Sequence, residues 1–188
     1  MFPWAFGAGK RGDGAQMTNL LQVVSGKLQA TTGRIAESLK VRIHAQKSEN
    51  AAKGQLRSGA TLKQILRHSS DALDMTRDAI TAEYQQLIKD SLPFFHASTE
   101  ALIQEARKHL KRIQTQAEAE LKAATSMIGK ADLYVRLQKE LAVAHDRALT
   151  DLSLALDYEA VANKNRRVRR ATKALGGWLG GLPKGSQQ

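Results

Sequence analysis

The sequence contains no cysteine, and only 5% of its residues are aromatic. Without cysteine the chain has no disulfide framework, thiol nucleophile or thiolate metal ligand. Few aromatic residues and an alanine-rich apolar fraction leave little side-chain area for a core, because alanine buries little surface. The composition therefore indicates a chain that completes its packing with other subunits. No apolar run approaches the roughly 18 residues that span a bilayer, so any membrane role requires amphipathic surfaces or assembly.

Acidic residues are absent from position 163 onward, where seven Lys/Arg supply +7 of the net charge of +11. Residues 1–60 carry +6, whereas residues 61–162 carry −2. Each end of the sequence also holds one of the two tryptophans, Trp4 and Trp178, among glycines. Cationic, aromatic ends on a nearly neutral middle are typical of a protein that contacts an anionic polymer or a membrane surface with its termini.

The middle of the chain has the apolar spacing of helices, and no alternating run bounded by turn residues indicates a strand. We predict an all-α fold in which long amphipathic helices form an elongated helical hairpin or bundle with Gly-rich termini. The predicted organisation is a flexible arm at 1–16, a single helical domain at 17–175 and a Gly-rich tail at 176–188. Within the domain we expect a break near 54–60, a turn near 91–97 and a kink or stop at Gly129.

One predicted helix carries an apolar residue at every seventh position, which is typical of a packing face between helices. The members of this heptad seam are Leu66, Leu73, Ile80 and Leu87. Two glycines, Gly26 and Gly33, also lie seven residues apart on the preceding helix. They either weaken that helix, at about 1 kcal/mol each relative to alanine, or form a groove that another helix approaches closely. The seam and the glycine face together predict a homo-oligomer.

Charge patterns predict the register of a helical hairpin around Pro93, which ends a helix because it cannot donate a backbone hydrogen bond. Asp71, Asp74 and Asp78 recur at helical spacing before this turn, and a basic face follows it. Antiparallel packing would place Asp78 opposite Lys111 and Arg112. Each such exposed ion pair contributes at most about 1 kcal/mol, so the pairs would set the register more than the stability.

The sequence gives little indication of catalytic chemistry. The five histidines are scattered, and none forms the His-Glu-x-x-His pattern of a helical zinc site. The segment Gly7-Ala8-Gly9-Lys10 lacks the glycine spacing, the Ser/Thr and the preceding strand of a phosphate-binding loop. We therefore expect a protein that is not an enzyme, with no catalytic residue, cofactor or metal.

Three interpretations of the basic ends remain open. The first is non-specific nucleic-acid binding through phosphate contacts, and the second is a membrane interface with aromatic anchors beside basic residues. The third is docking into neighbouring subunits, with tryptophans filling pockets. The candidate polyanion- or lipid-contacting residues are Lys164, Arg166, Arg167, Arg169, Arg170 and Lys173. The candidate membrane or subunit anchors are Trp4, Phe6, Trp178 and Leu179.

Residues 17–90 resemble the small internal virion protein of short-tailed bacteriophages. The resemblance rests on an Ala/Gln/Lys-rich helix containing residues 45–52, and on a glycine-marked break at residues 57–61. A helix with Leu66, Ala72, Leu73, Asp74 and Tyr84 follows the break, and the basic, glycine-containing C-terminal segment is also similar. The chain departs from the family pattern because it lacks a clear apolar N-terminal segment.

This resemblance implies a helical, non-enzymatic protein packaged inside the capsid and ejected ahead of the genome. After ejection it would join other, larger ejection proteins in a conduit across the host cell envelope. Its partners would be copies of itself, other virion proteins, non-specifically bound DNA and host membrane lipid. The alternative function is a basic helical scaffold or a non-specific nucleic-acid-packaging protein without a membrane role.

Overall fold

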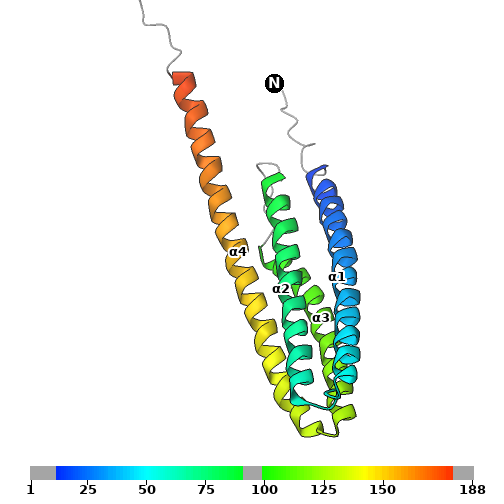
Figure 1. The fold of residues 1–188 in the computed structure, drawn as a ribbon. Coiled ribbons are helices and arrows are strands. Elements are labelled where there is room, and N and C mark those ends of the chain that lie inside the picture. Colours follow the sequence, from blue (N-terminus) through cyan, green and yellow to red (C-terminus); the bar gives the residue numbers. More distant parts are fainter. Residues whose placement is uncertain (1–11, 91–98, 180–188) are drawn as a thin grey trace, which may run out of the picture.

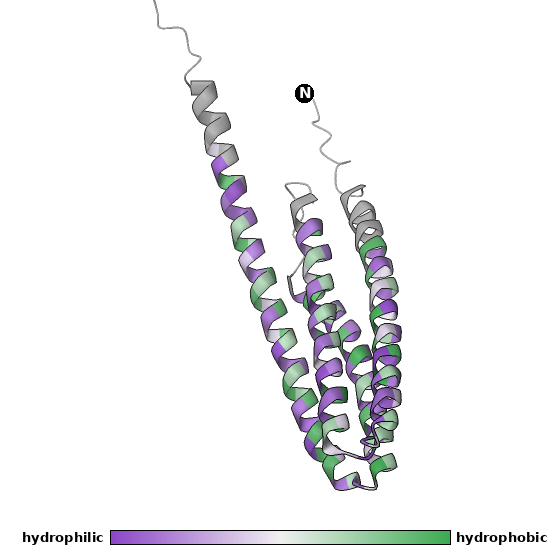
Figure 2. Ribbon diagram, in the orientation of Figure 1, coloured by the Kyte–Doolittle hydropathy of each residue, from purple (hydrophilic) through white to green (hydrophobic). Residues whose placement is uncertain are grey.

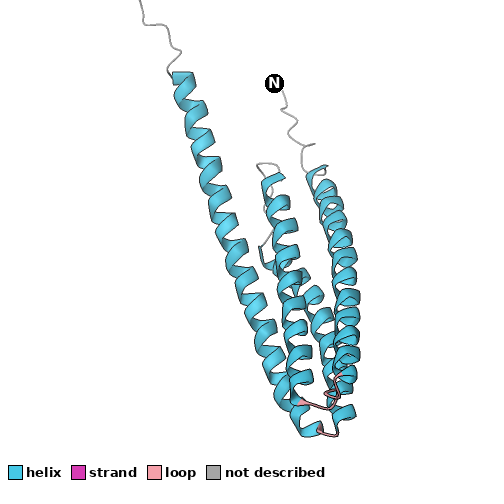
Figure 3. Ribbon diagram, in the orientation of Figure 1, coloured by secondary structure: helices cyan, strands magenta, loops and turns pink. Residues whose placement is uncertain are grey.

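The computed structural model describes residues 12–90 and 99–179 as four α-helices, and these residues contain no strand (Figure 1; Figure 3). The helices are α1 (Gly12–Ala52), α2 (Gly59–Asp90), α3 (Thr99–Ile128) and α4 (Ala131–Leu179). The prediction of an all-α helical bundle is confirmed. Pro93 and the predicted turn around it lie outside the described residues.

Consecutive helices run in opposite directions along one axis, and α4 continues past the ends of the other three (Figure 1). Helices α2 and α3 pack against each other and against both remaining helices, while α1 and α4 do not touch one another within the described residues. The bundle thus has a central α2–α3 pair with α1 on one side and α4 on the other. Both flanking helices keep an outer face that no described helix covers.

Two glycines with positive φ end helices by the same local mechanism. Gly54 has φ 68° and Gly129 has φ 75°, a conformation that glycine adopts without a side-chain clash. After α1, the amide of Gly54 donates to the carbonyl of Ala51 (3.0 Å), and Gln55 donates to Asn50 (2.7 Å). The turn after α3 repeats both bonds around Gly129. These Schellman motifs satisfy carbonyls that the helix ends leave free, and the chain reverses at both places.

A polar cluster joins the end of α1 to the start of α2. Ser58 caps α2, because its hydroxyl accepts a hydrogen bond from the Thr61 amide (3.3 Å). Asn50 is buried and donates to the side chains of Thr61 (2.9 Å) and Gln64 (2.7 Å). The Thr61 hydroxyl in turn donates to the carbonyl of Gln55 (3.0 Å). The buried polar groups of this turn are therefore paired with one another.

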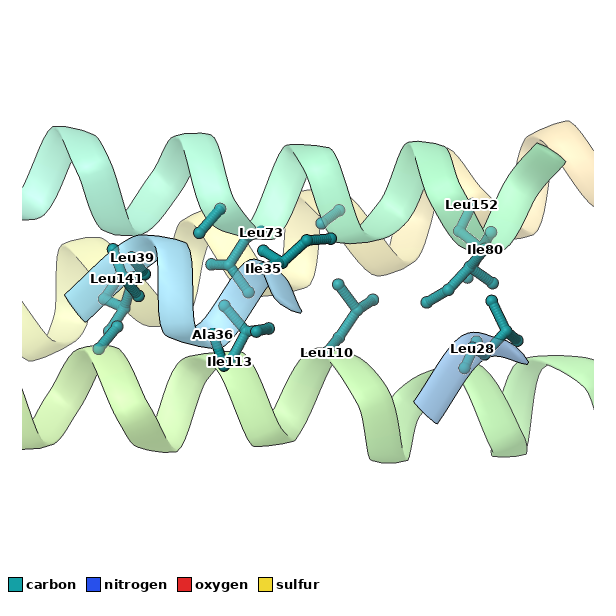
Figure 4. Packing of buried hydrophobic residues seen from close by; sticks show 14 of the residues in the cluster. Leu28, Ile35, Ala36, Leu39, Leu73, Ile80, Leu110, Ile113, Leu141 and Leu152 are labelled. Atoms are coloured by element: carbon teal, nitrogen blue, oxygen red, sulfur yellow. The ribbon is translucent and has the colours of Figure 1, made fainter. Parts of the chain in front are cut away.

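Leucine, isoleucine and alanine side chains from all four helices form one continuous core. Figure 4 shows Leu28, Leu73, Leu110 and Leu141 pointing into the space that the helices enclose. Hydrophobic residues recur along each described helix and are not gathered in a single block (Figure 2). Two hydroxyl residues of α2, Ser69 and Thr76, are also fully buried. Each donates to the backbone carbonyl four residues earlier (2.8 Å), so neither hydroxyl is left unpaired.

The heptad seam of α2 lies within this single chain. Leu73, Ile80 and Leu87 are buried in the core, and Leu66 packs against it partly buried. The seam is thus covered by the chain's own helices and gives no support to self-association. Gly26 is exposed and Gly33 half-buried, and a Cβ added at either would have no neighbour within 4 Å. Among the described residues, no other helix therefore approaches the backbone closely at these glycines.

The ion pairs expected between Asp78 and Lys111 or Arg112 are not formed, so this part of the predicted register is wrong. The Asp78 carboxylate accepts hydrogen bonds from the neighbouring Arg77 (2.9 and 3.0 Å), and Lys111 donates to Gln114 (3.1 Å). The reason is helical geometry. Asp78 lies two residues from both Thr76 and Ile80, which are buried, and residues two apart on a helix point in nearly opposite directions.

Two predicted boundaries also differ from the structure. Helix α1 begins at Gly12, inside the segment 1–16 assigned to an arm, and α4 continues to Leu179, inside the segment 176–188 assigned to a tail. Glycine lowers helix propensity by only about 1 kcal/mol per residue. A long helix that is already nucleated can therefore extend through a few glycines, because extension costs less than nucleation.

Truncation of a buried core side chain should lower the free energy of unfolding strongly, whereas truncation of an exposed side chain should not. Ile80 is fully buried in α2, so we expect Ile80→Ala to lower the free energy of unfolding by about 2–5 kcal/mol. Val41 is 62% exposed on α1, and Val41→Ala should change it by less than about 0.5 kcal/mol. Urea denaturation followed by circular dichroism measures both. Equal effects of the two substitutions would contradict the four-helix core.

Candidate functional site

The candidate site is the distal part of α4, where the helix leaves the cover of the bundle. Leu152 and Leu156 are fully buried, and Glu159 is the last buried residue among the described side chains of α4. Beyond it α4 continues as a single helix past α2 and α3 (Figure 1). All but one of the seven basic residues after position 162 fall on this stretch of α4.

Three basic side chains of this stretch are described, and all three are exposed. Arg166 reaches back along the helix, where its guanidinium pairs with the carboxylate of Glu159 and donates to the carbonyl of Ala162 (3.4 Å). Lys164 and Arg169 form no ion pair with any described residue. The distal helix therefore presents positive charge that the described part of the protein does not neutralise.

The basic positions surround the helix axis and do not form one face. Successive residues of an α-helix are rotated by about 100°, so residues 164, 166, 167 and 169 fall on four different sides. A bound polyanion could thus approach the distal helix from several directions. Such binding would be electrostatic and insensitive to sequence, because no helix-turn-helix or stacking platform fixes a base edge in the described residues.

The other predicted site residues are placed only in part. Arg167, Arg170, Lys173, Trp178 and Leu179 belong to α4, but their side chains are not among those described. Trp4 and Phe6 lie outside the described residues. The structure thus brings the basic residues onto one helix, and it does not place the proposed anchors against them.

Helix α4 also carries an exposed apolar stripe that was not predicted from the sequence. We call it the outer stripe; its members are Leu154, Tyr158, Val161 and Val168. These residues are spaced by four, three and seven positions, which places them on one side of the helix. The signal was present in the sequence, but it is interleaved with the leucines of the core-facing side, such as Leu152 and Leu156.

A shallow groove of about 720 Å³ separates α3 from α4 beside the outer stripe. It is lined by the apolar side chains of Ile103, Leu149 and Leu154 and by the charged side chains of Glu100, Arg107 and Asp157. Asp157 is exposed and makes no ion pair with another described residue. The groove thus carries charges of both signs, and it is open to solvent and holds no enclosed site for a small molecule.

A second polar group of residues lies inside the bundle between α1 and α3. Ser25 donates to the carboxylate of Glu105 (3.0 Å), and the Thr32 hydroxyl contacts Nδ1 of His109 (3.3 Å). Nε2 of His109 lies 3.9 Å from Glu105, is buried and has no hydrogen-bond partner. A hydrogen bond from Lys108 holds the pKa of Glu105 below its ordinary value. This group ties α1 to α3 and leaves one buried ring nitrogen of His109 without a hydrogen-bond partner.

Burial of His109 makes the stability of the bundle depend on pH. Burial lowers the pKa of His109 below 6.5; Glu105 opposes this shift, and Arg112 and Lys108 add to it. The unfolded chain therefore takes up the proton at higher pH than the folded chain. The contribution of His109 to stability is complete above pH 6.5, and it is lost as the pH falls through the folded pKa.

We accordingly expect His109→Gln to flatten the loss of stability between about pH 7 and pH 5. Glutamine cannot take up the proton, yet its amide keeps a hydrogen-bonding group near Thr32. The free energy of unfolding at each pH, from denaturant titrations, measures the effect. His44→Gln on the exposed side of α1 is the matched control. The same pH dependence in His109→Gln and in the unaltered protein would contradict the assignment.

No group of three or more acidic or histidine side chains that could hold a metal occurs in the described residues. Within the same residues, no helix combines the length and the apolar character needed to cross a membrane. Comparison of the chain with protein-family models, with curated proteins and with solved structures finds no match. The function must therefore be inferred from the chain's own residues.

Proposed function

We propose that the chain is a structural, non-enzymatic virion protein of the ejection type. In this proposal it is stored in the capsid interior and assembles, with copies of itself and with larger ejection proteins, into a conduit across the host cell envelope. Genome delivery through the conduit would bring its basic residues against DNA or anionic lipid. The observation that carries the proposal is the distal part of α4, a single basic helix that projects beyond the bundle.

Three properties of the chain support this proposal. The described helices form a slender bundle with a mainly aliphatic core, which suits passage through a narrow channel. Lys164 and Arg169 are exposed without a described partner carboxylate, so they are available to phosphate groups. The resemblance of residues 17–90 to internal virion proteins of short-tailed bacteriophages gives the same class of function.

The alternative is a basic helical scaffold or nucleic-acid-packaging protein that never meets a membrane. It shares the electrostatic contact but needs no apolar anchor beside the basic residues. The two functions therefore differ in what Trp178 and Leu179 contribute, whereas both require the arginines of distal α4. Two sets of substitutions separate them.

The electrostatic contact is tested by replacing Arg166, Arg167, Arg169 and Arg170 with glutamine. Binding to duplex DNA and to anionic liposomes should both weaken by about tenfold or more at 0.1 M salt. The slope of log K against log salt should fall by about 0.9 for each phosphate that the variant no longer neutralises. Filter retention and liposome flotation across a salt series measure these changes.

A matched control removes the same charge elsewhere. Lys63, Arg67, Lys122 and Lys130 are exposed basic residues of the bundle, and no ion pair with another described residue holds them. Replacing these four with glutamine should leave the slope nearly unchanged. Equal losses of affinity in the two variants would mean that net charge, and not the distal helix, governs binding.

The apolar anchor is tested by replacing Trp178 and Leu179 with serine. Flotation with anionic liposomes should weaken selectively, because aromatic anchoring is not screened by salt. DNA retention should remain within about twofold, because neither side chain carries charge. Intact liposome binding in this variant would overturn the membrane role and leave the packaging function as the better explanation.

A further inference from the structure

The outer stripe lies on the side of α4 opposite its core face. Leu154, Tyr158, Val161 and Val168 are 64%, 75%, 59% and 55% exposed. Leu152 and Leu156, two positions to either side of Leu154, are fully buried. Residues two apart on a helix point in nearly opposite directions, so α4 has two apolar faces. The bundle covers one of them, and no described residue of the chain covers the other.

The spacing of the outer stripe is that of a coiled-coil seam. Intervals of four and three residues link Leu154, Tyr158 and Val161, and the same alternation continues through Asn165, Val168 and Thr172. A helix seam repeating every seven residues is buried by a second helix that packs alongside it. Toward the bundle the equivalent positions hold Arg147 and Asp151, which lie 3.9 Å apart as an ion pair. The seam therefore begins at Leu154.

The apolar area of the stripe suits a weak complex between two helices. Full burial of leucine, valine and tyrosine side chains is favourable, but these residues are few and already partly covered. They therefore offset the cost of association only narrowly. The stripe is too short for a permanent interface but sufficient for a concentration-dependent one.

The charge along α4 selects the orientation of the partner. Residues 140–160 hold five acidic residues and one basic residue, whereas residues 161–173 hold six basic residues and no acidic residue. A parallel second copy would set one basic segment against the other. An antiparallel second copy sets each basic segment against an acidic one, and a two-fold axis repeats the contact. The α4 helix is thus complementary to itself in the antiparallel direction only.

We propose that a second copy of this chain packs antiparallel on the outer stripe. Tyr158 then lies beside Val161 of the second copy, and Leu154 beside its Asn165. The same register places Asp157 opposite Lys164, two side chains that have no ion-pair partner among the described residues of their own chain. The two bundles lie on opposite sides of the paired helices. This interface does not rest on the proposed ejection role.

Removal of the apolar contact is the first test. Sedimentation equilibrium of the full chain should show a monomer–dimer equilibrium, and Tyr158→Ser with Val161→Ser should weaken it at least thirtyfold. The matched control changes two equally exposed valines of α1, Val23 and Val41, to serine, with no effect on the equilibrium. Thermal unfolding of both variants should match that of the unaltered protein. A monomer at all concentrations overturns the proposal.

Exchange of the charges is the second test. Asp157→Lys and Lys164→Asp should each weaken the dimer by about tenfold, and the double exchange should restore it, because two symmetric ion pairs reform. In a parallel pair Lys164 would lie near Arg169 of the second copy, as g and e residues of parallel coiled coils do. Lys164→Asp would then strengthen the dimer. Strengthening by this substitution, or failure of the double exchange, overturns the proposal.

Disulfide cross-linking between introduced cysteines tests the register directly. The chain contains no cysteine of its own that could form other cross-links. A mixture of Asp157→Cys and Lys164→Cys chains should form cross-links between the two variants, and Asn165→Cys alone should not. In a parallel pair residues 157 and 164 are about 10 Å apart along the axis, beyond the Cα–Cα reach of a disulfide, about 7 Å. Self-cross-linking of Asn165→Cys would therefore indicate a parallel pair and overturn the proposal.

A lipid surface is the competing occupant of the stripe. If the unaltered chain is monomeric and the Tyr158→Ser, Val161→Ser variant floats less with anionic liposomes, the stripe is a membrane contact. That result would overturn self-pairing while leaving the proposed membrane role intact. Conversely, dimers that persist in a variant with no DNA or liposome binding would support the interface after the proposed function had failed.

Discussion

The length of α4 relative to the helices that cover it decides what this protein can contact. Helix α3 has 30 residues and α4 has 49, so the antiparallel α3–α4 pair must leave the last part of α4 without a partner in α3. Glu159 is the last buried residue among the described side chains of α4. Asp157, two residues before it, lines the same groove as Glu100 in the first turn of α3. The last part of α4 continues a helix that the bundle has already nucleated, and it is open to contact by a polyanion or another helix.

Helical periodicity was the part of the fold that the sequence could predict, because spacing alone decides which residues share a face. Leu73, Ile80 and Leu87 do lie together in the core, as their sevenfold repeat requires. What covers that face is a matter of tertiary packing, which no local pattern encodes. The same seam suggested another subunit, whereas the chain's own helices bury it. Ser69 and Thr76 can be buried beside this seam because each hydroxyl is satisfied by its own helix backbone.

The candidate site, like the fold, could be predicted from the sequence only in part. The basic segment was visible from composition, because no acidic residue follows position 162. The predicted helical domain at 17–175 already included this segment. The extension of α4 beyond it was not predicted, since it depends on how far a nucleated helix continues through Gly176 and Gly177. The outer stripe was missed because a helix with two opposed apolar faces has little contrast between its sides. The error at Asp78 was of another kind. Its spacing from Asp71 and Asp74 correctly predicted one face of a helix, but that face points away from α3.

The basic residues and the outer stripe occupy the same stretch of helix, and each limits what the other can do. Positive charge on both sides of the outer stripe opposes parallel association of copies, and salt or a bound polyanion weakens that repulsion. Antiparallel pairing avoids the repulsion even without salt or a polyanion, because it places the acidic segment near the bundle against the basic segment of the second copy. Pairing and polyanion binding then compete for Lys164, whereas Arg169 lies further along the basic segment. A polyanion would on this ground loosen the antiparallel pair, and a protein stored against nucleic acid would be monomeric until released from it.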